Sequence, residues 1–405
     1  MTTALRDNID WVGYVDWNVR DFHGYETLRG ATYNSYLIRD QKNTLIDTVK
    51  APYAGNLIAN IRKFIDPADI NYLVCNHVEM DHSGAMPRVL EACSNAVVLC
   101  NERCRKTLSL HFDTSNWKFQ VIKDGEILSI GRRTLQFINT PMIHWPESMF
   151  TYVPEEKLLF SMDAFGQHYA TSQRFDDENP KETALGEAKI YYASIVMPFS
   201  KQVRGLLESV KDLPIDMIAT SHGVIWRSYV GDIIKAYHEW SHFRAKPKVL
   251  ILYDTMYSST NLMADAIYEG AIRPDVEVKL HHVRTVGLAR LAGELLDSAV
   301  VAVGTPTVNK TMMPMVASLL AYFKGLEPEN KAGFSFGSYG WSRGGAEAVD
   351  GFLKDMKFEI LRGPLICQYR PDEAVLEQCR EAGKMISEKA LEMSAIPRAE
   401  ISSEP

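Results

Sequence analysis

The chain has 405 residues, of which 46% are hydrophobic and 23% are charged, and its formal net charge is −7. This length allows two or three domains with separate cores, and the mixing of acidic and basic residues argues against the clustered basic face of a nucleic-acid-binding protein. No apolar run approaches the roughly 18 residues of a membrane span, and residues 1–11 lack the apolar core of a signal peptide. We therefore expect a soluble, cytoplasmic protein.

The cysteines predict free thiols and not a disulfide framework or an iron–sulfur centre. They are Cys75, Cys93, Cys100, Cys104, Cys367 and Cys379. None of them forms the Cys-x-x-Cys pair that is typical of a rubredoxin-like or iron–sulfur site. Because sparse cysteines in a long chain fit a reducing cytosol, we expect most of them to be buried as small hydrophobic side chains.

The first part of the chain predicts a mixed sheet covered by helices. Residues 32–39 and 44–49 are alternating or apolar on either side of a polar turn at 40–43, which is the pattern of a hairpin. Further apolar runs that predict strands lie at 72–75, 96–99, 134–138, 149–153 and 158–161. Helical periodicity is limited to segments such as 87–93 and 202–210.

A regular alternation of strands and helices begins after a polar, basic stretch at 242–248. We expect strands at 248–253, 276–283, 300–303, 333–336 and 358–361, and helices at 261–269, 288–295, 314–323, 346–356 and 372–391. Five strands separated by helices predict a parallel, doubly wound α/β domain. We place the two domains at 1–246 and 247–395, followed by a polar tail at 396–405.

Potential metal ligands follow the predicted strands of the first domain. They are His77, Glu79, Asp81 and His82 just after the strand at 72–75, and then His144, Asp163 and His222, each just past another apolar strand. Alone, His144 or His222 would more often be a structural histidine. Burying two carboxylates beside two imidazoles, however, costs several kcal/mol without cations. Seven such side chains at one sheet edge are enough to bind two metal ions.

The order His-x-Glu-x-Asp-His, followed by a distant His, Asp and His, resembles the metallo-β-lactamase superfamily. Its hydrolases usually carry a second histidine in place of Glu79 and bind zinc, whereas the glutamate is similar to the flavodiiron branch. The swap is chemically reasonable because carboxylate-rich sites suit iron. The phrases at 21–25, 144–149 and 163–167 also resemble that family. The resemblance implies an αββα sandwich followed by a flavodoxin-like domain with a five-stranded sheet of order 2-1-3-4-5.

The resemblance also implies how the ligands divide between two irons. One iron would be bound by His77, Glu79 and His144, the other by Asp81, His82 and His222, and Asp163 would bridge them. Beside these ligands, His23, His168 and either Tyr192 or its neighbour Tyr191 are candidates for catalytic assistance through packing or hydrogen bonding.

The second domain carries a loop rich in hydroxyl groups after its first predicted strand. Hydroxyl and backbone N–H groups at the start of a helix can hold a phosphate, and the loop resembles that of flavodoxins, which bind FMN. It is neither a Walker A loop nor a Gly-x-Gly-x-x-Gly motif. Two later loops follow the third and fourth strands, at the sheet edge where such folds bind their ligand. The candidate FMN contacts are Thr255, Met256, Tyr257, Ser258, Ser259, Thr260, Thr305, Pro306, Thr307, Asn309, Ser338, Tyr339, Gly340, Trp341 and Gly344.

The whole pattern is similar to the flavodiiron oxidoreductases, a family with members such as rubredoxin:oxygen oxidoreductase and coenzyme F420H2 oxidase. The resemblance implies reduction of dioxygen to water or of nitric oxide to nitrous oxide, with FMN and two irons as cofactors. It also implies a rubredoxin-like protein or reduced coenzyme F420 as electron donor, and a head-to-tail homodimer or homotetramer. The alternatives are a binuclear zinc hydrolase with an appended flavodoxin domain and an electron carrier with an inactive metal domain. Glu79 argues against the first, and the complete ligand set argues against the second.

Overall fold

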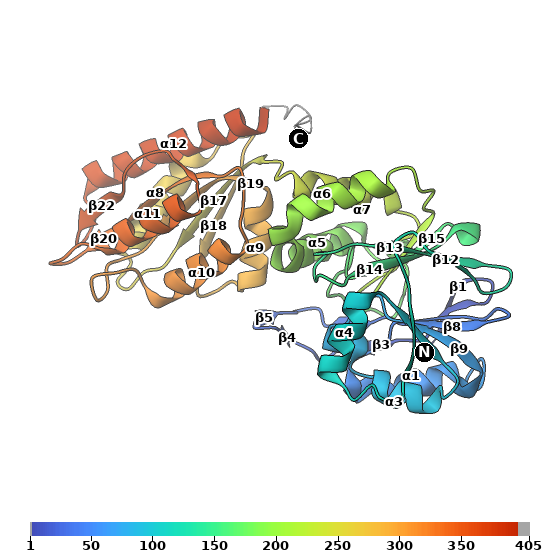
Figure 1. Cartoon of the computed structure of the whole chain (residues 1–405). Helices are drawn as coiled ribbons and strands as arrows, with labels where there is room; N and C mark the ends of the chain where they lie inside the picture. The colour runs from blue at the N-terminus through green and yellow to red at the C-terminus, as the bar shows by residue number, and fades with distance from the viewer. Residues whose placement is uncertain (1, 396–405) are drawn as a thin grey trace. The chain divides into compact units, whose positions relative to one another are not determined.

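The computed structural model describes residues 2–395 and divides into two compact units, the first ending at His238 and the second beginning at Glu239 (Figure 1). The tail expected at 396–405 lies outside the described residues. Among the helices of residues 2–395, none combines the length and the hydrophobicity that a membrane span requires. All six cysteines are buried free thiols, as expected.

A seven-stranded mixed sheet forms one layer of the first unit, in the order β1-β2-β7-β8-β9-β10-β11. Its strands are β1 (Thr3–Arg6), β2 (Ile9–Trp11), β7 (Tyr36–Ile38), β8 (Asn43–Ile46), β9 (Ile70–Val74), β10 (Val97–Cys100) and β11 (Lys118–Val121). The predicted hairpin is the antiparallel pair β7–β8. Its first strand is shorter than predicted because residues 31–33 form β6 (Ala31–Tyr33), which pairs with β3 (Tyr14–Asp16) instead.

A five-stranded sheet forms the second layer of this unit. Its strands, in spatial order, are β12 (Ile127–Ser129), β13 (Thr134–Asn139), β14 (Met149–Val153), β15 (Leu158–Met162) and β16 (Met217–Thr220). The first four form an antiparallel meander, and β16 joins β15 in parallel. A small ladder of β4 (Asp21–Phe22) and β5 (Tyr25–Glu26) stands apart from both sheets.

One hydrophobic core fills the space between the two sheets. Trp11, Val74 and Leu99 from the first sheet belong to the same buried cluster as Phe137 and Phe160 from the second. Burying a large apolar side chain contributes about 1.5–3 kcal/mol, so this shared core is a main source of stability for the unit.

Helices cover the outer side of the first sheet through a second core. Alternate strand residues such as Leu37, Leu45 and Leu73 pack in this core with Leu57 and Val89 from helices. The helices of this unit are α1 (Ala54–Ile61), α2 (Met80–Ser83), α3 (Met86–Ala92), α4 (Glu102–His111), α5 (Lys181–Tyr191), α6 (Ser200–Val210) and, up to His238, α7 (Val230–Ser241). The pattern predicted α3 and α6 to within two residues, but α1, α4, α5 and α7 were not predicted. The sandwich class expected from the resemblance is confirmed.

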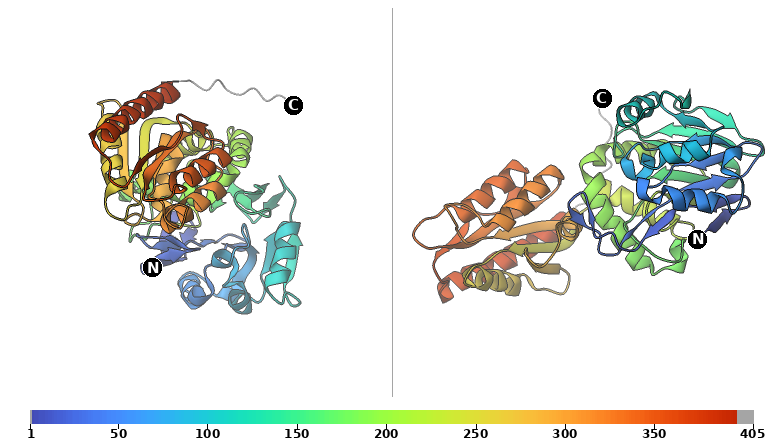
Figure 2. Two further views of the ribbon diagram at one scale, coloured as in Figure 1. Left: turned by 90° about the vertical axis from the view of Figure 1, so that its left-hand side faces the viewer. Right: turned by 90° about the horizontal axis from the view of Figure 1, so that it is seen from below.

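The second unit is a parallel, doubly wound sheet. Its strands are β18 (Glu277–His282), β17 (Lys246–Tyr253), β19 (Ser298–Gly304) and β20 (Ala332–Tyr339) in spatial order, with β21 (Glu359–Ile360) and β22 (Leu365–Gln368) both paired to β20. Its helices are α8 (Ser259–Ala271), α9 (Leu288–Asp297), α10 (Pro314–Gly325), α11 (Gly345–Asp355) and α12 (Glu373–Ala395), and they lie on both faces of the sheet (Figure 2, right).

The predicted order 2-1-3-4-5 is confirmed, with one difference at its fifth position. A single strand was expected at 358–361, but two short strands, β21 and β22, share that edge. Gly363 and Pro364 lie between them, and such a pair interrupts a strand because proline lacks a backbone N–H and glycine favours turns. The central strands β17 and β19 are almost entirely buried, which explains their continuous apolar sequences.

Candidate metal centre and flavin site

The turn after β9 carries four of the predicted ligands, and it is fixed by buried hydrogen bonds. The backbone N–H of Asn76 donates to Oδ1 of Asp47 at 2.7 Å, and the Asn76 side chain donates to Oδ2 of Asp47 at 3.0 Å. The carbonyl of Asn76 accepts from the N–H of Met149 on the second sheet. The chain then enters α2, which bears Asp81 and His82. The turn therefore lies at an edge where both sheets contribute side chains.

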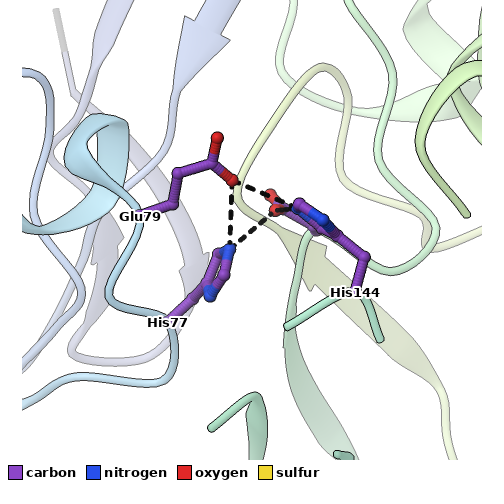
Figure 3. Close-up of side chains that lie close together, drawn as sticks. His77, Glu79 and His144 are labelled. Atoms are coloured by element: carbon purple, nitrogen blue, oxygen red, sulfur yellow. Dashed lines mark hydrogen bonds and ion pairs between the residues drawn. The ribbon is translucent and has the colours of Figure 1, made fainter. Parts of the chain in front are cut away.

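A first group of ligand atoms is formed by His77, Glu79, His144 and Asp163. Nε2 of His77 lies 3.3 Å from Oε2 of Glu79 and 3.3 Å from Oδ2 of Asp163. Nε2 of His144 lies 3.1 Å from each of these same two oxygens. Figure 3 shows the side chains of His77, Glu79 and His144 pointing toward one another.

A second group is formed by Asp81, His82 and His222, all of them buried. Nε2 of His222 lies 3.2 Å from Oδ2 of Asp81 and 3.1 Å from Oδ1 of Asp163. Nε2 of His82 lies 3.0 Å from the same Asp163 oxygen. Asp163 therefore reaches both groups, with Oδ2 directed to the first and Oδ1 to the second.

The chemistry of these side chains fits two cations. Oδ1 of Asp81 and Nε2 of His82 are buried and form no hydrogen bond among the described residues, although Nε2 of His82 lies 3.0 Å from Oδ1 of Asp163. Such orphaned groups are costly unless something else in the site satisfies them. Three carboxylates with four imidazoles and no thiolate form a set of hard and borderline ligands, which suits iron better than zinc.

The electrostatics of the histidines lead to the same conclusion. Burial by itself lowers the pKa of His222, but hydrogen bonds to Asp163 and Asp81 outweigh it and raise the pKa to about 10. Burial likewise opposes protonation of His77, yet Asp163, Glu147 and Glu79 raise its pKa well above the usual value. The carboxylates are thus stabilised by positive charge on the neighbouring histidines. Bound cations would supply this charge in place of the protons on the imidazoles.

Groups behind the ligands orient them. Nδ1 of His77 lies 2.8 Å from Oε1 of Glu147, which also accepts from the N–H of Val78. Nδ1 of His222 donates to the carbonyl of Thr32 at 2.6 Å. The sequence assigned no role to Glu147 or Thr32, although Glu147 lies inside the phrase 144–149 that was singled out as similar to the family.

The predicted assisting residues occupy different places. Nε2 of His23 lies 2.7 Å from Oε1 of Glu79. His168 is buried against Phe22 and Tyr191, with ring centroids 4.9 Å apart in both cases. Burial, and then the nearby His222, lower the pKa of His168 to about 3, so its imidazole is neutral.

The sequence left Tyr191 and Tyr192 as alternative assisting residues, and their side chains lie in different surroundings. Tyr191 lies on the wall of a cavity beside the ligand groups. The hydroxyl of Tyr192 instead lies 2.8 Å from Oγ of Ser200, and its ring packs edge-on against Tyr237. The cavity has a volume of about 200 Å³. It is lined by Phe22, His23, Tyr25, Glu79, Asp81, His144, Asp163, Tyr191, Ser194, Ile195 and His222.

The second unit has a cavity of about 610 Å³ at the carboxyl edge of its sheet. Eleven of the predicted FMN contacts line it, namely Thr255, Met256, Tyr257, Ser259, Pro306, Thr307, Asn309, Ser338, Tyr339, Gly340 and Trp341. Val308, Tyr369 and Arg370 also line it and were not predicted. Tyr369 and Arg370 directly follow β22. Because the sequence pattern did not predict this strand, it gave no reason to place these two residues at this edge of the sheet.

The four remaining predicted contacts lie beside this cavity and not on its wall. Ser258 precedes α8 with φ 66°. Thr260 is buried with its Oγ1 3.3 Å from Oγ of Ser338. Thr305 accepts from the N–H of Met313, and Gly344 caps α11 with φ 140°. These residues shape the loops that surround the cavity.

Family models match both units. A model described as "ODP family beta lactamase" matches residues 31–223, and a flavodoxin model matches residues 251–383. These matches agree with the sandwich and the doubly wound sheet described above.

Relatives match almost the full length of the chain. A nitric oxide reductase from Moorella thermoacetica is 45% identical over 95% of this chain and 98% of its own length. The solved structure of rubredoxin oxygen:oxidoreductase from Desulfovibrio gigas is 38% identical with a TM-score of 0.95, over 98% of this chain and 100% of that one. The flavodiiron protein from Giardia intestinalis is 37% identical with a TM-score of 0.95, over 97% and 98%. With this identity over both units, and with the two ligand groups in place, the chain belongs to the flavodiiron protein family.

Proposed function

We propose that this protein is an oxidoreductase that reduces dioxygen to water or nitric oxide to nitrous oxide at a di-iron centre, with electrons passing through FMN. The observation that carries the proposal is the convergence of seven ligand-type side chains into two groups that share Asp163. The names of the relatives, nitric oxide reductase and rubredoxin oxygen:oxidoreductase, support the same chemistry.

The ligand groups would each hold one iron. His77, Glu79 and His144 would bind the first, Asp81, His82 and His222 the second, and Asp163 would bridge the two. When bound, two ferrous ions would supply two electrons and reduced FMN two more. These four electrons match the four that, with four protons, convert dioxygen to two waters. Two nitric oxides need only two electrons and two protons to give nitrous oxide and water.

Several side chains prepare the cavity for a small gas. The rings of Phe22 and Tyr25 and the side chain of Ile195 form apolar walls that limit the entry of water. Glu147 and the Thr32 carbonyl hold the imidazoles of two ligands in the tautomer that leaves Nε2 free to bind a cation. These hydrogen bonds therefore fix the orientation of the His77 and His222 imidazoles before any substrate binds.

His23 is the residue best placed to bring protons from solvent. Its side chain is 61% exposed, while its Nε2 lies 2.7 Å from Oε1 of Glu79 on the cavity wall. An imidazole that contacts both solvent and the cavity wall can take a proton from water and release it at the Glu79 carboxylate. We assign this step to Nε2 of His23.

The cavity of the second unit would bind FMN. Backbone N–H groups and the hydroxyl of Ser259 at the start of α8 would hold its phosphate. Tyr257 and Trp341 are each 92% exposed although they are large aromatic side chains. Packing on the isoalloxazine ring would explain why such side chains lie uncovered on the cavity wall.

The proposed function also requires an electron donor and implies an assembly of several copies of the chain. We propose a rubredoxin-like protein or reduced coenzyme F420 as electron donor, and a head-to-tail homodimer or a pair of such dimers as the working assembly. The dimer would place each flavin against the irons of the partner subunit, through an isologous contact. We place the protein in the cytoplasm, since its six thiols are all unpaired.

The experiment that tests the proposal compares the same preparation with different metals. Protein loaded with FMN and iron, and protein loaded with FMN and zinc, are supplied with one competent electron donor and either gas. The proposal predicts consumption of dioxygen or nitric oxide by the iron form only. Equal turnover by the zinc form, or tight zinc retention with hydrolase activity and no gas consumption, would support a hydrolase instead.

A further inference from the structure

A buried carboxylate stands at the start of the first loop of the flavin cavity. Asp254 directly follows β17, is 0% exposed, and precedes Thr255, which lines that cavity. Its carboxylate is contacted by His282, the last residue of β18, and by Arg284 just beyond that strand. Nε2 of His282 lies 3.2 Å from Oδ1. Arg284 makes a two-point contact, with Nη2 2.8 Å from Oδ1 and Nε 3.1 Å from Oδ2.

The same contacts hold the backbone of Thr255 at both of its polar groups. The N–H of Thr255 donates to Oδ1 of Asp254 at 2.7 Å, and its carbonyl accepts from Nη2 of Arg284 at 3.3 Å. A guanidinium that binds a carboxylate at two points fixes the relative orientation of the two groups, which a single-point contact does not. Arg284 therefore holds the start of the loop both directly and through Asp254.

The following residues of the loop have free backbone donors. Among the described residues, the N–H groups of Met256, Tyr257 and Ser258 have no hydrogen-bond partner. Met256 and Tyr257 lie on the cavity wall, and Ser258 has φ 66° and immediately precedes α8. Successive free N–H groups at the start of a helix bind anions. The loop thus combines a fixed start with unpaired donors, as expected for an anion site that is organised before its ligand binds.

We propose that Arg284 is a positioning residue for the flavin phosphate and makes the cavity prefer FMN to riboflavin. By holding Asp254 and the Thr255 carbonyl, it keeps the free N–H groups of residues 256–258 in the arrangement that binds a phosphate monoester. Without Arg284 the loop would have to be ordered when the phosphate binds, and that cost would appear as lost affinity. This inference rests on the proposed function, because it takes the cavity to be the FMN site.

Riboflavin is the probe that isolates the phosphate, because it differs from FMN only in lacking that group. The full-length protein, freed of flavin, is titrated with FMN and separately with riboflavin, and binding is followed by quenching of flavin fluorescence. Arg284→Gln should weaken FMN binding by about 10-fold or more and leave riboflavin binding within about 2-fold of the wild type. A general loosening of the domain would instead weaken the binding of both flavins.

Three further variants complete the test. Arg284→Lys keeps a cation beside the buried Asp254 but cannot make the two-point contact, so it should also lose FMN affinity alone, even if Arg284→Gln folds poorly. Arg290→Gln, at an exposed arginine on α9, should bind both flavins like the wild type. In an Asp254→Asn background, Arg284→Gln should cause a smaller further loss than it does in the wild type, because Asp254 is the group through which Arg284 acts.

The outcomes separate the inference from the proposed function. Loss of affinity for FMN but not for riboflavin, in each Arg284 variant that folds, supports the inference. If these variants weaken the binding of both flavins equally, or bind FMN like the wild type, Arg284 does not serve the phosphate and the inference is wrong, while the FMN site itself stands. If the wild type binds neither flavin, the assignment of the cavity to FMN fails as well.

Discussion

Nδ1 of His77 lies 2.8 Å from the Glu147 carboxylate, while Nε2 of the same ring faces Glu79 and Asp163. Both residues are almost completely buried. The hydrogen bond fixes the orientation of the imidazole and leaves Nε2 free for a cation. Glu147, which is not a predicted metal ligand, therefore determines how the His77 imidazole is oriented toward a cation.

This relationship predicts the effect of Glu147→Gln. The amide can still contact His77 but cannot offset the charge of a bound cation, so iron affinity should fall by about 10- to 100-fold. Competition with a chelator of known affinity measures the loss. Glu91→Gln, at an exposed glutamate on α3, is the matched control and should bind iron like the wild type. Unchanged iron affinity in Glu147→Gln would show that the orienting bond is dispensable.

Asp163→Asn should disrupt the centre more severely. Among the described residues, Asp163 is the carboxylate that reaches both ligand groups, and an amide would compensate the charge of neither cation. We expect a folded protein that retains FMN and loses most of its iron after gel filtration. Asp212→Asn, at an exposed position, provides the control. Normal iron content and turnover in Asp163→Asn would rule out a bridging role.

Ser259→Ala tests the flavin site independently of the metals. Loss of one hydrogen bond to a charged phosphate should weaken FMN binding by at least about 10-fold. The affinity is measured by quenching of flavin fluorescence on titration of FMN into flavin-free protein. Thr285→Ala removes a hydroxyl that donates only to the His282 carbonyl and should have no effect. Equal FMN affinity of both variants would place the phosphate elsewhere.

Asp40 predicts a pH-dependent part of the stability. Burial alone would raise the pKa of its carboxyl group, but backbone N–H groups of Arg132 and Gln41 and the charge of Arg133 lower it below the usual value. A lowered pKa in the folded state gives stability that is complete above the unfolded pKa of about 3.9 and is lost as the pH falls through the folded value.

Asp40→Asn should therefore destabilise the protein by about 1–3 kcal/mol at pH 7. The difference from the wild type should narrow below about pH 4, where the carboxyl group takes up a proton in the unfolded chain before it does so in the folded protein. Urea unfolding of both proteins at a series of pH values provides the measurement, with Asp212→Asn as control. A difference that stays constant down to pH 3 would contradict the role given to the Asp40 charge.

The sequence predicted the structure best where residues close together along the chain determine it. His77, Glu79, Asp81 and His82 follow one buried strand within six residues, so their convergence could be predicted without knowing the rest of the fold. The parallel order of the second unit was equally accessible, because each strand is a continuous apolar run between amphipathic helices.

The sequence was least informative where distant segments decide the structure. Whether Tyr191 or Tyr192 faces the cavity depends on the π-helix that follows, and helical periodicity does not reveal such a turn. Glu147 and Thr32 act through contacts 70 and 190 residues away along the chain. Only the packing of the two sheets brings these groups behind the ligands.

Counting the gas consumed by fully reduced protein tests the central claim most directly. Protein with FMN and two irons is reduced anaerobically by four electrons, the donor is removed, and a known amount of dioxygen is added. The account predicts that one dioxygen is consumed per chain without hydrogen peroxide, and that iron-free protein with FMN does not reproduce this result. Release of hydrogen peroxide at the same rate with and without iron would contradict it, because the gas would then react at the flavin alone.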